Sequence, residues 1–224
     1  MRALIPLILV SIPVVLAEDS DQVKRLQEAA AVFSEIMEAP DKGIPRDLIE
    51  RARCIVIVPG LKKGAFVFGG QYGKGFLSCR GKTGGWSAPG SVRVEGASFG
   101  FQIGGLESDV ILLVMNQRGA DKLLSSQFTL GGQTEIAAGP VGRSATAQTD
   151  ALMRAEILSW SRARGIFAGL SLQGATLRQD IDDNQALYGK RLRNRAIVTE
   201  GVAPPKAAER LLGLLRAYPF KKSA

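Results

Sequence analysis

The chain has 224 residues, of which 46% are apolar, and this is enough to bury one sizeable core. It contains no histidine, which excludes Ser-His-Asp and Cys-His catalysis and the zinc sites that use imidazole ligands. The net charge is +8, and two cysteines are too few for a four-thiolate zinc site. We therefore expect one non-enzymatic domain without a cofactor or a metal.

The first 17 residues have the pattern of a cleavable signal peptide. Arg2 supplies a positive start, residues 4–16 are almost wholly apolar, and Val15 and Ala17 are small residues where signal peptidase reads the chain. The apolar run is too short to span a bilayer. We expect an exported protein, periplasmic or secreted, whose single domain covers residues 18–224; an uncleaved anchor is the alternative.

Two helices are expected at the start of the domain, within residues 20–52. Apolar residues recur at three- and four-residue steps over residues 20–39, with Ser20 or Asp19 placed to cap the helix. Pro40 ends it. A second, short helix is predicted to begin at Pro45 and to end near Ala52.

Residues 53–175 form a glycine-rich β core, because 22 of the 26 glycines fall between residues 54 and 174. Short apolar runs bounded by glycines predict strands at residues 55–58, 64–68, 75–79, 92–103, 110–115, 136–147 and 165–172. Residues 61–64 and 71–74 are interpreted as hairpin turns. Glycines inside the runs predict bulges or close backbone approach. We infer a strongly curved antiparallel sheet, sandwich-like or barrel-like, in an α+β fold.

The remaining elements are helices and one ambiguous segment. Helices are predicted at residues 120–126 and 179–188, and the second half of residues 150–160 is interpreted as a strand. Residues 176–224 are expected to hold the C-terminal helices and a stretch rich in basic residues. Within them, residues 196–199 predict an edge strand. Residues 204–218 predict a basic amphipathic helix, which lies either on a membrane or, as we favour, on the protein's own core.

The two cysteines are interpreted as unpaired. Export would permit a disulfide between Cys54 and Cys79. If their segments are strands one and three of a meander, however, the two residues lie about 10 Å apart, beyond disulfide reach. We expect Cys54 to be a small buried hydrophobe.

The positive charge is concentrated at the C-terminus. From residue 189 onward there are nine basic and two acidic residues, whereas residues 18–188 carry nineteen of each sign. This distribution favours an anionic surface as the partner of the C-terminal segment. Nucleic acid fits the charge but not the export signal, so we do not expect it as a partner.

Two short motifs are tested and not adopted. The Gly-Lys-Thr at residues 81–83 resembles the end of a phosphate-binding loop, but Phe76 stands where that loop requires glycine. Four polar residues would suit a hard cation, but they lack an EF-hand glycine and a closing glutamate, so a solvated helix start is preferred. These residues are Asp180, Asp182, Asp183 and Asn184.

Six motifs occur in a fixed order, at residues 65–75, 85–89, 100–104, 138–143, 159–169 and 184–189. Together they resemble the SYLF lipid-binding domain family over about residues 44–189; the chain departs from the pattern at Trp160, where a tyrosine is usual. Eukaryotic members bind phosphoinositides, and some join SH3 domains and regulate actin. Bacterial members are exported single-domain proteins, the kind that this chain resembles. The resemblance implies affinity for anionic lipid; we leave the actin role aside because export separates the protein from cytoplasmic actin.

Eight basic residues are the candidates for lipid contact. Arg162 and Arg164 would clamp a phosphate, and four cations in residues 190–195 would each contribute about 1 kcal/mol near an anionic membrane. The alternative for each residue is that it lies on a solvated surface or forms a salt bridge within the protein. The candidates are Lys62, Lys63, Arg162, Arg164, Lys190, Arg191, Arg193 and Arg195.

Two hypotheses of function follow. The first is peripheral binding of anionic phospholipid in the bacterial cell envelope. The alternative is a structural or protein-interaction module of the periplasm that docks an envelope protein.

Overall fold

The computed structural model describes residues 20–39, 43–65, 69–98, 104–131, 136–139, 155–163, 166–167, 172 and 174–221. The expected signal peptide lies outside these residues. The helices are α1 (Asp21–Glu38), α2 (Arg46–Arg51), α3 (Gln117–Leu123), α5 (Ile181–Tyr188), α6 (Asn194–Thr199), the 3-10 turn η1 (Lys206–Ala208) and α7 (Glu209–Arg216). The strands are β1 (Cys54–Ala65), β2 (Gly69–Cys79), β3 (Gly90–Ser98), β4 (Gly104–Val114), β5 (Gln127–Thr129), β6 (Ile136–Ala138), β7 (Ile157–Ala163), β8 (Ile166–Phe167) and β9 (Thr176–Gln179).

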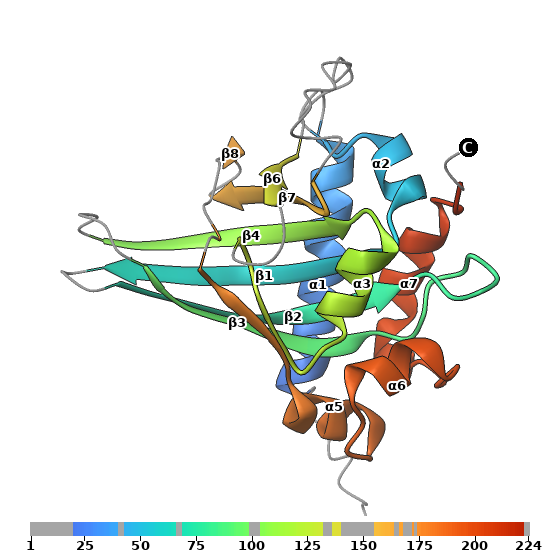
Figure 1. Ribbon diagram of the computed structural model, residues 1–224. Coiled ribbons are helices and arrows are strands. Elements are labelled where there is room, and N and C mark those ends of the chain that lie inside the picture. The colour runs from blue at the N-terminus through green and yellow to red at the C-terminus, as the bar shows by residue number, and fades with distance from the viewer. Residues whose placement is uncertain are drawn as a thin grey trace, which may run out of the picture.

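The strands form one curled sheet, with α1 and α7 on one side and α3 on the other (Figure 1). Its order is β5-β9-β3-β2-β1-β4-β7-β6, and β8 pairs with β7. The α+β class and the strong curvature are confirmed. The sheet is mixed rather than antiparallel throughout, because β6 runs parallel to β7.

Strand β1 lies at the centre and is buried on both faces, which explains its unbroken apolar start. Ile55 and Ile57 face the core beneath α1 and α7, whereas Val56 and Val58 belong to a second core on the opposite face. This alternation follows from the two-residue period of a strand. The continuous apolar run therefore predicts a central strand.

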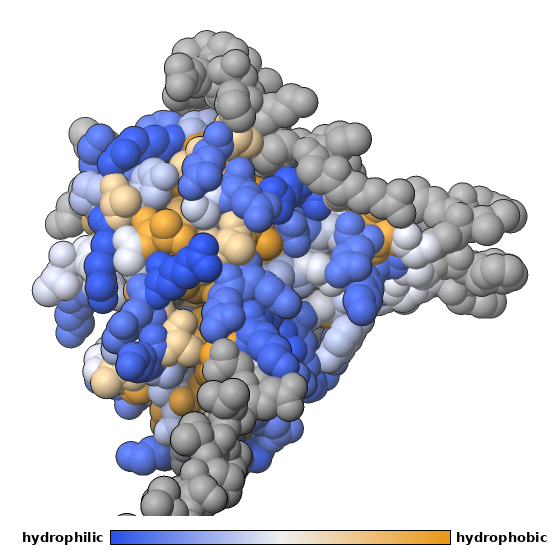
Figure 2. All heavy atoms as spheres, turned by 180° about the vertical axis from the view of Figure 1, so that it is seen from behind, coloured by the Kyte–Doolittle hydropathy of each residue, from blue (hydrophilic) through white to orange (hydrophobic). Residues whose placement is uncertain are grey.

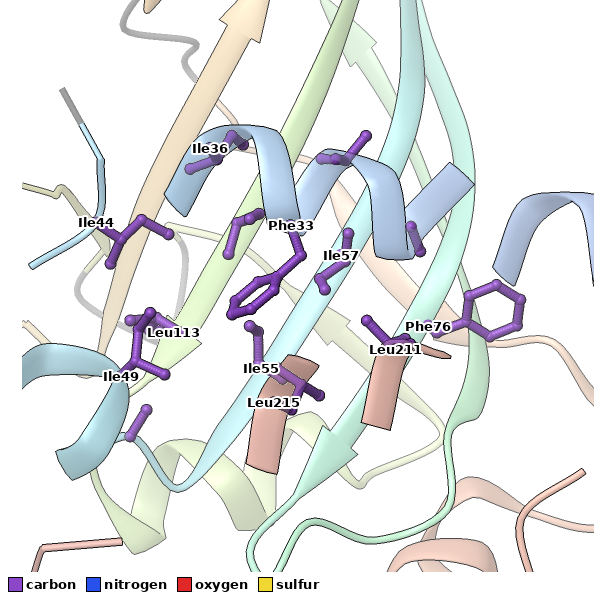
Figure 3. Packing of buried hydrophobic residues seen from close by; sticks show 14 of the residues in the cluster. Phe33, Ile36, Ile44, Ile49, Ile55, Ile57, Phe76, Leu113, Leu211 and Leu215 are labelled. Atoms are coloured by element: carbon purple, nitrogen blue, oxygen red, sulfur yellow. The ribbon is translucent and has the colours of Figure 1, made fainter. Parts of the chain in front are cut away.

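The helical layer closes the first core. Phe33 of α1, Leu211 and Leu215 of α7, and Ile55 of β1 point toward one another (Figure 3). The amphipathic helix therefore packs on the protein's own core, as favoured from the sequence. Figure 2 shows the opposite view of the molecule as mostly hydrophilic, with small separated apolar patches.

The predicted N-terminal and central helices are present with shifted ends. The helix at residues 20–39 is α1, where Ser20 occupies the N-cap position but its side chain makes no capping hydrogen bond. Pro45 is the N-cap of α2 rather than its first residue. The helices predicted at residues 120–126 and 179–188 are α3 and α5, and the strand expected in the second half of residues 150–160 begins β7.

The two predicted hairpin turns were wrong. Residues 61–64 lie within β1 and residues 71–74 within β2, so the run predicted at 55–58 and the start of the run predicted at 64–68 belong to one strand; residues 66–68 lie outside the described residues. The strand continues because a bulge at Gly60, with φ of 56°, absorbs the register shift between Val58 and Leu61. A Cβ at Gly75 would lie 2.0 Å from the carbonyl oxygen of Ile57, which is the close backbone approach expected of a strand glycine.

The predicted edge strand at residues 196–199 was also wrong. These residues belong to the helix α6, whose Ile197 and Val198 are both buried. A run of four apolar residues is too short to distinguish the 3.6-residue period of a helix from the two-residue period of a strand. Here the contact of α6 with β3 favours the helix.

Cys54 and Cys79 form a disulfide with an S–S distance of 2.12 Å, which corrects the expectation of unpaired thiols. The two residues are direct partners on the neighbouring strands β1 and β2. The sequence argument placed them two strands apart because it counted β1 as two strands. Both are buried, as expected for Cys54.

Candidate functional site

The structure separates the eight basic candidates into different regions. Lys62 and Lys63 lie near the end of β1, Arg162 lies in β7, and four candidates follow α5. Arg164 lies outside the described residues. The candidates therefore do not form one continuous patch.

The four candidates that follow α5 form what we call the basic segment, residues 190–195. Lys190, Arg191, Arg193 and Arg195 are all exposed. Arg191 pairs with Asp182 at 2.9 Å, and Arg195 donates a hydrogen bond of 3.4 Å to the carbonyl of Asp121. Within the described part of the chain, no carboxylate forms an ion pair with Lys190, Arg193 or Arg195. Three of the four charges therefore face solvent without compensation.

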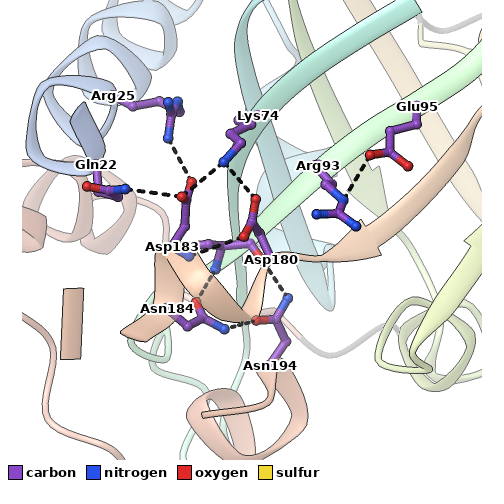
Figure 4. A network of polar contacts seen from close by, with 10 residues as sticks. Gln22, Arg25, Lys74, Arg93, Glu95, Asp180, Asp183, Asn184 and Asn194 are labelled. Carbon is purple, nitrogen blue, oxygen red and sulfur yellow. Dashed lines mark hydrogen bonds and ion pairs between the residues drawn. The ribbon is translucent and has the colours of Figure 1, made fainter. Parts of the chain in front are cut away.

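Two buried asparagines hold the basic segment against β3 (Figure 4). Asn184 donates to the carbonyl of Leu192 at 2.9 Å and to Oδ1 of Asn194 at 2.8 Å. It also accepts a hydrogen bond from the backbone N–H of Ser91, while Asn194 donates to the Ser91 carbonyl at 2.9 Å. The cations thus stand on a turn whose backbone is fixed from beneath. Sequence reasoning missed this role because only the fold brings β3 beside the two amides.

Helix α5 is itself tied to α1 and β2 by ion pairs between buried carboxylates and partly buried cations. Lys74 of β2 bridges Asp180 and Asp183 at 2.9 and 3.0 Å, and Arg25 of α1 reaches Asp183 at 2.9 Å (Figure 4). Asp180 also caps α5 by accepting from the backbone N–H of Asp183. The preferred sequence interpretation, a solvated helix start, was therefore wrong for these two residues.

This network keeps its groups charged. Burial is the largest single effect and raises the pKa of Asp180, but the hydrogen bonds from Lys74 and from the backbone of Asp183, together with the nearby positive charges, outweigh it and hold the pKa below the ordinary value of aspartate. Burial lowers the pKa of Lys74, and the hydrogen bonds to Asp180 and Asp183 raise it above its usual value. Among the described residues, no group of three or more His, Cys, Asp or Glu side chains is arranged to hold a metal ion. Asp180 and Asp183 anchor α5 through their ion pairs.

The end of the sheet carries the other two lysines. Lys62 lies opposite Tyr72 and Glu107, and Lys63 lies opposite Leu106. Tyr72 and Leu106 are 49% and 36% exposed and are the large apolar side chains that stand out at the described surface. Cross-strand partners share a face, so each face of this end presents one lysine beside one exposed apolar side chain. The sequence predicted that these lysines lie at the tip of a hairpin, but both lie within β1.

Arg162 is largely buried and is paired with two carboxylates. It pairs with Glu35 of α1 at 2.7 Å and with Asp109 of β4 at 2.9 Å. Burial would lower the pKa of Arg162, but the two carboxylates raise it above its ordinary value. A cavity of about 650 Å³ beside it is also lined by Glu107 and Asp109. This arrangement is the internal salt bridge that the sequence left open as an alternative.

Within the described ranges, no helix is both long enough and apolar enough to span a membrane.

Comparison with known proteins identifies the family. Residues 95–218 match the Ysc84 family, described as "Las17-binding protein actin regulator". The chain is 34% identical to LAS seventeen-binding protein 3 of Saccharomyces cerevisiae over 189 residues, covering 82% of this chain and 41% of the relative. It is 30% identical to human SH3 domain-containing YSC84-like protein 1 over 203 residues, covering 89% of this chain and 59% of the relative. The chain thus spans about two fifths to three fifths of the length of these relatives. It belongs to the Ysc84 family, the SYLF domain family whose motifs it carries.

Proposed function

We propose that the protein binds the surface of anionic phospholipid membranes peripherally and without catalysis, in an exported compartment of a bacterial cell. The observation that carries this proposal is the basic segment, where Lys190, Arg193 and Arg195 are exposed and lack carboxylate partners within the described residues. The absence of histidine throughout the sequence supports a non-enzymatic role.

The energetics of a surface contact fit this segment. Each Lys or Arg near an anionic membrane contributes about 1 kcal/mol, so three uncompensated cations supply about 3 kcal/mol, or roughly a hundredfold in affinity. Because Asn184 and Asn194 already order the turn, little backbone conformational entropy is lost when the cations meet phosphate groups.

The sheet end is a second point of contact in this proposal. Lys62 and Lys63 supply charge there, and Tyr72 and Leu106 supply exposed apolar surface for the interfacial region. Arg162 is left out because Asp109 and Glu35 balance its charge.

Export is supported by two features. The N-terminal sequence has the pattern of a signal peptide, and a structural disulfide between Cys54 and Cys79 persists in oxidising compartments. The location is tested by fractionating cells and probing the envelope and the cytoplasm for the mature protein. Recovery from the cytoplasm alone, with both cysteines reduced, would refute this part of the proposal.

Vesicle co-sedimentation tests the lipid contact. The protein should bind vesicles containing phosphatidylglycerol or cardiolipin, should bind pure phosphatidylcholine far less, and should be released as salt rises. Replacing Lys190, Arg193 and Arg195 with alanine should weaken binding roughly a hundredfold. A matched control replaces Arg51, Lys206 and Arg210, three exposed cations elsewhere, and removes the same net charge.

The two triple variants separate a specific surface from general charge. If the control loses as much affinity as the variant of the basic segment, net charge rather than this segment accounts for binding. Equal binding to anionic and zwitterionic vesicles would refute the proposal altogether.

A protein-interaction module is the second candidate function. It is favoured by the exposed Tyr72 and Leu106, and by relatives that are named for binding another protein. It predicts a stable complex in crosslinked envelopes that survives neutralisation of Lys190, Arg191, Arg193 and Arg195. If that complex is absent, or is lost in the variant, this candidate fails.

A further inference from the structure

A basic pocket of about 740 Å³ lies where the link between β2 and β3 meets the C-terminal end of α7. The link lies beside α7 (Figure 1), and Trp86 fixes it there by donating to the carbonyl of Leu215 at 3.0 Å. The pocket has the size of small-molecule sites in proteins. It is lined by Arg53, Arg80, Gly81, Lys82, Thr83, Gly84, Gly85, Trp86, Gln117, Arg216, Pro219 and Phe220.

The charge of the pocket is one-sided. Arg53, Arg80, Lys82 and Arg216 line it, and its described lining includes no carboxylate. The negative charge that reaches Arg80 is that of Glu50, whose oxygens already bind Arg46 at 2.7 Å and Lys221 at 2.6 Å. Four cations around one cavity repel one another, and a bound anion would relieve that repulsion.

Arg80 is fixed in place before any ligand arrives. Its guanidinium lies 3.8 Å from the centre of the Trp86 ring and donates to the carbonyls of Gly84 at 3.0 Å and Tyr218 at 2.6 Å. These partners are neutral, and Nε of Arg80 is buried without a hydrogen-bond partner. Burial lowers the pKa of Arg80 to about 10, an effect that Glu50 only partly opposes. Arg80 thus supplies a rigid positive charge that the described residues do not neutralise.

The other lining groups determine which anion fits. Arg53 lies over the Phe220 ring at 4.9 Å, while Lys82 and Arg216 line the pocket as exposed cations. Thr83 and Gln117 add neutral hydrogen-bonding groups. Several cations favour a doubly charged phosphate over a single carboxylate, and the apolar wall of Trp86 and Phe220 suits the carbon part of an ester.

We propose that this pocket binds a phosphate monoester dianion, carried either by a soluble compound or by a lipid headgroup. The site shares no residue with the basic segment. It was missed in the sequence because Arg53, Arg80 and Arg216 come from three distant parts of the chain, and the Gly-Lys-Thr at residues 81–83 was judged only against the phosphate-binding loop.

Calorimetric titration of the full chain with glycerol 3-phosphate, inorganic phosphate and neutral glycerol tests the proposal. The two phosphates should bind and glycerol should not. Fluorescence offers a second readout, because Trp86 lines the pocket whereas Trp160, the other tryptophan, is buried in the core.

The exposed members of the pocket are the residues to change, because Arg80 also anchors backbone carbonyls. The double variant Lys82→Glu, Arg216→Glu should bind glycerol 3-phosphate at least a hundredfold more weakly, since each lost charge-assisted contact is worth about tenfold or more. The matched control is Lys206→Glu, Arg210→Glu, which reverses two exposed charges outside the pocket lining.

Vesicles distinguish the two sources of phosphate. If the ligand is a lipid headgroup, the pocket variant should lose binding to phosphatidic acid, a monoester, more than to phosphatidylglycerol, a diester. If the ligand is soluble, vesicle binding should match that of the control while glycerol 3-phosphate binding is lost. The alanine variant of the basic segment should retain glycerol 3-phosphate, so the two proposals fail separately. No binding of either phosphate at millimolar concentration, or equal affinity in pocket and control variants, would overturn the inference.

Discussion

The backbone N–H of Arg80 donates a hydrogen bond of 2.7 Å to the carbonyl of Arg53, directly beside the disulfide that joins Cys54 to Cys79. Two cations of the basic pocket are therefore held next to each other by a covalent link and a backbone hydrogen bond. Their spacing is set by the pairing of β1 with β2 and does not depend on a ligand.

Removing the disulfide should lower both stability and phosphate affinity. The variant Cys54→Ala, Cys79→Ala opens a loop whose ends are 25 residues apart, which costs about 3 kcal/mol in the free energy of unfolding. Urea denaturation measures this loss, and calorimetry should show weaker glycerol 3-phosphate binding because Arg53 and Arg80 are less firmly placed. A reductant should destabilise the natural protein but not the variant; equal effects on both would contradict the prediction.

The two buried asparagines should control the basic segment. Asn194→Ala removes hydrogen bonds to Asn184 and Ser91, and should cost about 1–3 kcal/mol and weaken vesicle binding because the turn loosens. Ile36→Val is the matched control, since it removes one buried methyl group of α1 in the first core, outside the basic segment, at a cost of about 0.5–1.5 kcal/mol. Unchanged vesicle binding by folded Asn194→Ala would show that the asparagine is not needed to present the cations.

Stability should fall in acid partly through Asp180. Its pKa in the folded protein lies below the ordinary value of about 3.9, so its stabilising contribution is complete above that value. The contribution is then lost as the pH falls through 3.9 toward the pKa of the folded protein. Urea denaturation between pH 7 and pH 3 should show a shallower decline for Asp180→Asn than for the natural protein. An identical slope would mean that other carboxylates whose pKa is lowered, such as Glu50 and Glu156, dominate.

The amphipathic helix should contribute to stability rather than to membrane contact. Leu215 is fully buried in the first core, so Leu215→Ala should cost about 2–5 kcal/mol in thermal or urea unfolding. Arg210→Ala on the exposed side of α7 should change stability by less than about 0.5 kcal/mol. Vesicle binding by folded Leu215→Ala should match that of the natural protein; a large loss would instead place α7 at the membrane.

The sequence predicted much of the fold because local patterns dominate there. The three- and four-residue spacing of Leu26, Ala30 and Phe33 defines α1, and the glycines mark where strands approach closely. Gly139, in one of the family motifs, is explained in this way, since a Cβ there would lie 2.1 Å from the indole of Trp160. The helix depends on residues that are close in the chain, and the close approaches occur at positions where any side chain larger than that of glycine would clash.

The candidate site was predicted less well because it depends on distant partners. Lys190, Arg193 and Arg195 were found from charge alone, but Arg162 has the same sequence signal and is neutralised by Asp109 and Glu35. The turn predicted at residues 61–64 was likewise inferred from composition. The structure instead has one long strand there, because the bulge at Gly60 absorbs the shift in register. Pairing partners and registers come from the fold, and composition does not specify them.

The strand order also bears on which part of the chain can fold independently. The segment that matches the family description begins at residue 95, within β3, whereas β3 and β4 are joined in the sheet only through β2 and β1. A polypeptide cut to residues 95–218 would lack the two central strands and α1, leaving β3 and β4 without the neighbours that connect them. An autonomous folding unit must therefore include β1 and β2, and fragments chosen from the matched residues alone should be unfolded.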